Sequence, residues 1–158
     1  MSPLSGASPP PLSPKALRAR AIALLARREY SREELFRKLS AQAESIDLLN
    51  DILLQLVSEG LLSDQRFADS LARVKGTRFG VARIQYELRN KGVDESVLHS
   101  TLEELRSTEI QRAIDVLRKR VDVLPTAAKE RAKLHRFMAG RGFSSEAIAR
   151  ALLALDPP

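Results

Sequence analysis

Basic side chains are the residues of this sequence best suited to bind a partner. Lys and Arg number 26 against 20 Asp and Glu, which gives a net charge of +6 with His neutral. The excess is uneven, since residues 61–105 are balanced and residues 106–158 carry +5. Clustered basic residues attract phosphate groups and acidic protein surfaces. We therefore expect a polyanion or an acidic protein as partner, although any single basic residue is more simply explained as solvated helix surface.

The candidate binding residues fall in two groups. Between Arg66 and Lys91, seven basic residues stand against two acidic ones, and a second basic region follows residue 117. Few aromatic residues lie near them, which argues against a base-stacking platform for single strands. We predict that the partner is bound mainly by Arg73, Lys75, Arg78, Arg83, Arg89 and Lys91, supported by Arg118, Lys119, Arg120, Lys133 and Arg136.

Residues for catalysis or metal binding are scarce. The chain has no Cys and two His, His99 and His135, and neither His has a nucleophile or a second ligand near it in sequence. No Gly-rich nucleotide-binding loop and no His-Glu-x-x-His motif occurs. We expect no enzyme activity, no metal and no cofactor. No apolar run reaches the ~18 residues of a membrane span, and the polar start is unlike a signal peptide, so we expect a cytoplasmic protein.

The elements that must position these residues are helices. Leu (25) and Ala (20) far outnumber Val (8) and Ile (7), and aromatic residues make up 4%. That composition favours helix over strand. Apolar residues recur at helical spacing between joints marked by Gly and Pro. The pattern predicts nine helices: Lys15–Arg28, Arg32–Gln42, Ile46–Glu59, Asp64–Lys75, Val81–Lys91, Glu95–Leu105, Thr108–Val121, Ala127–Ala139 and Ser145–Leu155.

Four of these helices begin with a capping signal. Ser31 and Glu34 form a capping box, in which the hydroxyl accepts from the Glu34 amide. Asp94 and Ser144 are expected to cap the helices that follow them, and Ser63 or Asp64 the helix that starts there.

The joints reveal an internal repeat. Six positions recur with an offset of 50: Ile84, Leu88, Gly92, Val93, Leu98 and Leu102 match Leu134, Met138, Gly142, Phe143, Ile148 and Leu152. Such repeats stack into elongated, curved arrays, and one compact helical bundle is the alternative. We predict an all-α array of three tandem three-helix repeats, at residues 15–60, 61–105 and 106–158, after a disordered Pro/Ser-rich tail at residues 1–14.

Five motifs resemble the RecX family, bacterial regulators of the RecA recombinase. Its hallmark is similar to the run Gly-Leu-Leu-Ser-Asp-Gln-Arg-Phe-Ala at residues 60–68, and its later elements to residues 83–88 (Arg-Ile-Gln-Tyr-Glu-Leu) and 91–93 (Lys-Gly-Val). Residues 31–39 and 141–143 resemble further family elements, and the similarity extends over residues 16–155. Ser63 stands where the family more often has Asn or Asp, and the Pro-rich tail is not a family feature.

This resemblance implies a regulator and not an enzyme. RecX-like proteins associate with the RecA–DNA filament and mainly inhibit ATP hydrolysis, strand exchange and co-protease activity, in recombination, DNA repair and the SOS response. The resemblance also implies that RecA is the partner, that DNA phosphate is a further contact, and that the protein is a monomer. The alternative is an independent DNA-binding regulator of the helix-turn-helix kind, although no single helix carries an obvious set of base-reading residues.

Overall fold

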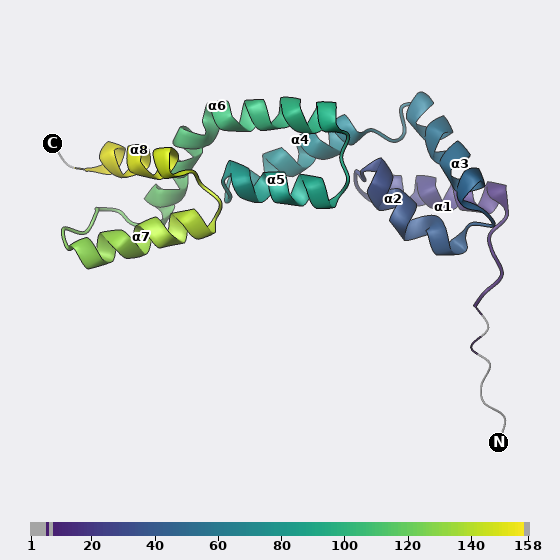
Figure 1. Ribbon diagram of the computed structural model, residues 1–158, viewed down its shortest axis with the longest axis horizontal. Helices are drawn as coiled ribbons and strands as arrows, with labels where there is room; N and C mark the ends of the chain where they lie inside the picture. The colour runs from purple at the N-terminus through teal and green to yellow at the C-terminus, as the bar shows by residue number, and fades with distance from the viewer. Residues whose placement is uncertain (1–5, 7, 157–158) are drawn as a thin grey trace, which may run out of the picture. The chain divides into compact units, whose positions relative to one another are not determined.

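The computed structural model describes residue 6 and residues 8–156, and in these residues it is helical without a β-strand. Eight α-helices and one 3₁₀ turn follow one another along the described chain. They form two compact units that divide between Ser63 and Asp64 (Figure 1). The all-helical fold predicted from the sequence is confirmed. None of the helices so described is long and apolar enough to cross a membrane.

The first unit holds α1 (Pro14–Arg27), α2 (Arg32–Leu39), the 3₁₀ turn η1 (Ser40–Gln42) and α3 (Ile46–Ser58). Its core is built mainly from leucines of all three α-helices. Ser31, fully buried, accepts from the Glu34 amide at 3.0 Å, as the capping box predicted. This cap fixes where α2 begins.

Part of the predicted disordered tail is ordered. Ser13 caps α1, whose first residue is Pro14. Proline is favoured at this position because the amides of the first helical turn have no partner within the helix, so the missing N–H costs no hydrogen bond. Leu12 packs against the core of the first unit, and its amide donates to the Gln42 carbonyl at 2.8 Å. The ordered chain therefore begins before the predicted boundary at residue 14. Residues 1–5 and 7 of the tail lie outside the described residues.

The second unit holds α4 (Asp64–Lys75), α5 (Val81–Asn90), α6 (Glu95–Arg120), α7 (Ala128–Gly140) and α8 (Ser145–Leu155). Figure 1 shows α6 beside α4 and α5 in its first part and reaching α7 and α8 in its second. The two helices predicted at Glu95–Leu105 and Thr108–Val121 are thus one continuous helix. The prediction of a joint there was wrong, because residues 106–107 are Arg and Ser and neither stops a helix.

The sequence similarity between the second and third repeats is visible in the structure. Ile84 and Leu134 are both buried, and Gly92 and Gly142 both follow a helix with positive φ, at 65° and 89°. Asp94 and Ser144 cap α6 and α8 at the same place in each repeat. The predicted boundary between the second and third repeats, after residue 105, falls inside α6. The two repeats therefore share this helix and lie in one compact unit.

Candidate partner-binding surface

The joint between α4 and α5 touches the joint between α7 and α8. The Gly80 amide donates to the Arg141 carbonyl at 2.8 Å, and the Ala82 amide donates to the Gly142 carbonyl at 3.2 Å. A Cβ atom on Gly80 would overlap the backbone of Gly142 and Phe143. Only glycine permits this approach, which brings residues from the second and third repeats together.

Arg112 of α6 holds the α4–α5 joint in place. Its guanidinium donates to the carbonyls of Gly76 (3.1 Å), Phe79 (2.7 Å) and Leu105 (2.9 Å). Burial lowers the pKa of Arg112, and the nearby Glu109 opposes that shift. The arginine therefore satisfies the carbonyls of Gly76 and Phe79, which follow the C-terminal end of α4.

Glu109 of α6 holds the α7–α8 joint in place in a similar way. The residue is 6% exposed, and its carboxylate accepts from the Ser144 amide at 2.6 Å. Neither Glu109 nor Arg112 was among the residues predicted from the sequence. A signal was available for the first, since Glu109 interrupts the buried positions Leu105, Ala113 and Val116 on one face of α6. An acidic residue at such a position needs a buried partner.

Basic side chains from both repeats gather where the joints meet. Around the Phe79 ring, the side chains of Lys75, Arg78, Arg83 and Arg141 lie 5.5, 5.5, 4.9 and 5.1 Å from its centroid. Around the Phe137 ring, Arg120 and Arg141 lie at 4.3 and 5.1 Å. Cations are held over aromatic faces by the negative charge of the ring surface. With Lys119, which shares a cavity with three of them, they form what we call the basic cluster: Lys75, Arg78, Arg83, Lys119, Arg120 and Arg141.

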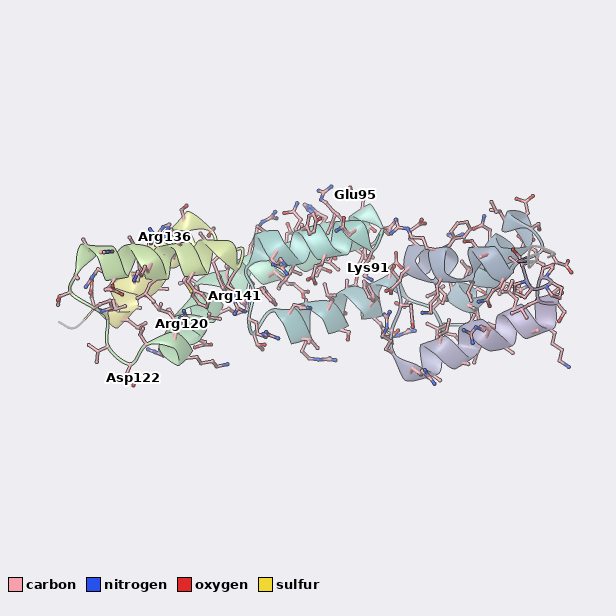
Figure 2. All side chains as sticks on the ribbon, turned by 90° about the horizontal axis from the view of Figure 1, so that it is seen from below. Lys91, Glu95, Arg120, Asp122, Arg136 and Arg141 are labelled. Carbon is pink, nitrogen blue, oxygen red and sulfur yellow. The ribbon has the colours of Figure 1, made fainter. Side chains whose placement is uncertain are left out.

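A cavity of about 190 Å³ lies within the basic cluster. Four cationic side chains line it, from Arg78, Lys119, Arg120 and Arg141, together with the Phe137 ring. Figure 2 shows Arg120 and Arg141 near each other at the end of the third repeat that meets the second. Guanidinium groups in such an arrangement bind phosphate or carboxylate oxygens through paired hydrogen bonds.

Glu87 is an acidic residue that contacts the basic cluster. Its carboxylate lies 3.8 Å from Lys75 Nζ and 3.7 Å from Arg83 Nε. Arg78 and Arg120 are exposed, so an anionic partner can reach them. The cluster therefore keeps a strong positive excess at an accessible surface.

The remaining predicted residues lie outside the cluster. Arg73 is exposed on α4, and Arg89 is 3.8 Å from Glu95 at the far end of α5, where Figure 2 also places Lys91. Arg118 and Arg136 are exposed, and Lys133 pairs with Glu130 at 3.4 Å. The structure thus brings together five of the predicted residues and adds Arg141, which the prediction omitted.

The two histidines lie at the surface, as expected. His99 is exposed and 3.5 Å from Glu103, and His135 is exposed on α7. Within residues 6 and 8–156, no group of three His, Asp or Glu could hold a metal ion. The arrangement that stands out chemically in the described part of the second unit is the basic cluster.

Comparison with known proteins identifies the family of this chain. Models of the second and third three-helix domains of RecX match residues 63–102 and 107–152. Regulatory protein RecX of Chromobacterium violaceum is 41% identical over 138 residues, which cover 87% of this chain and 90% of that protein. Regulatory protein RecX of Ralstonia nicotianae is 39% identical over 146 residues and 92% of each chain.

A solved structure shares the fold. The crystal structure of RecX from Lactobacillus salivarius superposes with a TM-score of 0.77 and covers 90% of this chain and 96% of its own, at 20% identity. The sequence relatives are similar enough, over enough of their length, to decide the family. The chain belongs to the RecX family of regulatory proteins.

Proposed function

We propose that this protein binds the RecA–DNA filament in the cytoplasm as a monomer and restrains it, lowering ATP hydrolysis, strand exchange and co-protease activity. The family and the names of its relatives support a regulatory role. The observation that carries the proposal is the convergence of basic residues from two repeats in the basic cluster. Such a surface suits DNA phosphates or acidic side chains of RecA.

Restraint of the filament needs no chemistry from this protein. A ligand that binds one conformation of a filament better than another shifts the population toward the first. Contacts spread over several helices add up by avidity, so a deep pocket is unnecessary.

The test is a charge reversal confined to the basic cluster. Arg78→Glu combined with Arg120→Glu changes two exposed residues that come from different repeats. Arg20→Glu combined with Arg27→Glu is the matched control, because both residues are exposed on α1 and the change in net charge is the same. Circular dichroism should show unchanged helix content for both variants.

Binding to RecA filaments on single-stranded DNA should fall about tenfold or more for the cluster variant and less than twofold for the control. RecA ATPase inhibition at substoichiometric ratios should fall in parallel. If the cluster meets phosphate, the salt dependence of binding should become shallower, by about one unit of slope for each phosphate that the variant no longer binds. Full inhibition by the folded cluster variant would contradict the assignment.

Naked single-stranded and duplex DNA serve as parallel ligands in the same assay. A chain that acts through the filament binds the filament much more tightly than either DNA. Equal affinity for naked duplex, with a preference for one sequence, would instead support the independent DNA-binding regulator.

A further inference from the structure

A second concave surface lies in the second unit, between α4 and α6. It is a groove of about 790 Å³, lined by both helices and by the first residues after α4. It meets the basic cluster only at its end, where Thr77 and Lys119 line both cavities. Its chemistry differs from that of the cluster, and we call it the α4–α6 groove.

The residues that line the groove follow the spacing of a helix-packing seam. Eight residues of α6 line the groove. Six of them are in alternate steps of four and three, namely Thr101, Leu105, Thr108, Arg112, Asp115 and Lys119, and Ser100 and Glu104 flank that row. On α4 and just beyond it, four of the six lining residues are in steps of four, three and four, namely Gln65, Asp69, Ala72 and Gly76, and Arg73 and Thr77 flank them. A period of 3.5 residues is the one with which helices present a continuous stripe to a neighbouring helix. The two walls thus form a slot suited to a third helix.

The middle of the groove has small side chains and an unsatisfied hydroxyl. Ala72, Gly76 and Thr108 let another backbone approach closely. Thr101 is 2% exposed, and its Oγ1 has no hydrogen-bond partner among the described residues. Buried hydroxyl groups are normally hydrogen-bonded, and leaving one unpaired is unfavourable. Thr101 lines the groove, so this unpaired hydroxyl lies beside the place that a helix would occupy.

The charges of the groove have both signs. Within the described part of the chain, the side chains of Arg73, Glu104 and Lys119 form no ion pair, although all three line the groove. Asp69 and Asp115 accept from the side-chain amides of Gln65 and Gln111, at 2.9 and 3.0 Å. The three carboxylates of the groove balance its three cations, Arg73, Arg112 and Lys119, so the groove lacks the positive excess that a phosphate chain needs, and nucleic acid is a poor occupant. Protein side chains of both signs can pair with this surface.

We propose that the α4–α6 groove binds an α-helix of the protein partner, one that presents small side chains toward Ala72 and Gly76 and charges of both signs toward Glu104, Arg73 and Lys119. The identity of that partner as RecA rests on the proposed function. The groove then makes the protein contact, while the basic cluster makes the contact with anionic groups at the adjoining surface.

A neighbouring pair of glutamates provides a matched test. Glu104→Arg reverses an unpaired charge in the groove, and Glu103→Arg makes the same change one residue away, outside the groove. A second pair tests the space itself: Ser100→Trp fills the groove, and His99→Trp places the same ring outside it. All four residues are exposed on α6, so the fold should tolerate each change.

Binding to RecA filaments on single-stranded DNA should weaken about tenfold for Glu104→Arg and Ser100→Trp. The two control variants should stay within twofold of wild type. Equal binding by the groove variants and their controls would overturn the groove proposal while leaving the proposed function intact. Failure of wild type to bind the filament would overturn both.

A cross-linking experiment identifies the occupant. The chain has no Cys, so Ser100→Cys introduces a single thiol that can carry a photoreactive benzophenone. Cross-linked RecA residues should fall at spacings of three and four, as expected for one face of a helix. Cross-links to DNA, or to a second copy of this chain with a matching change in sedimentation, would overturn the proposal.

Discussion

The contact between Gly80 and Gly142 allows a sharp test of how the second and third repeats are joined. In Gly80→Ala, the added methyl group would overlap the backbone of Gly142 and Phe143, so the two joints must move apart. That movement weakens the hydrogen bonds from Gly80 to Arg141 and from Ala82 to Gly142.

The size of the effect follows from the overlap and the two hydrogen bonds. Overpacking by one methyl group costs about 1–3 kcal/mol, and each of the two hydrogen bonds contributes about 1 kcal/mol. We expect the free energy of unfolding to fall by about 3 kcal/mol. For a chain of this length, that lowers the melting temperature by about 6–12 °C.

Gly140→Ala is the control, because a Cβ atom on Gly140, the last residue of α7, meets no other atom within 4 Å. Ala is the better helix former there by up to about 1 kcal/mol, so this variant should melt at or above the wild-type temperature. Thermal unfolding followed by circular dichroism measures both. Gly80→Ala should also weaken filament binding, because it separates Arg78 from Arg141. The reasoning is refuted if Gly80→Ala melts no lower than Gly140→Ala.

Three further predictions concern the core and the start of the chain. Phe67 is 5% exposed, so Phe67→Ala should cost about 3–5 kcal/mol in chemical denaturation; a cost below about 1 kcal/mol would mean that the ring is not a core residue. Asp64 accepts from the Asp94 amide at 3.0 Å, so Asp64→Ala should cost about 1 kcal/mol in the same assay, and Asp64→Asn less. Deletion of residues 2–11 should leave the melting temperature and RecA inhibition unchanged, whereas deletion through Ser13 should lower the melting temperature because it removes the cap of α1 and the packing of Leu12.

Helix type and helix starts could be predicted because their causes are local. Ser31, Asp94 and Ser144 each accept an amide hydrogen bond from a residue two or three positions later, within reach of a sequence motif. The helix break near residue 106 was predicted although neither Gly nor Pro stands between Leu105 and Thr108. The residues themselves contain nothing that stops α6, and the helix continues.

The joining of the repeats could not be predicted because its contacts are remote in sequence. Arg112 bonds to Gly76, 36 residues away, and Glu109 to Ser144, 35 residues away. For the same reason, the sequence did not show that Arg78 and Arg120 line one cavity, although both were predicted as binding residues. Arg141 was not among the predicted binding residues, because its position near two aromatic rings depends on the tertiary contact.

The continuity of α6 has a consequence for how such a chain can gain or lose repeats. A separate three-helix unit can be duplicated by copying a segment between two loops. Here the last helix of one repeat is also the first helix of the next, so an insertion between them must preserve the helical phase across residues 105–108. An insertion of about seven residues, close to two turns, keeps both buried faces aligned, whereas about two extra residues rotate the third repeat by roughly half a turn. The number and order of repeats beyond this point are therefore constrained by the geometry of a single helix.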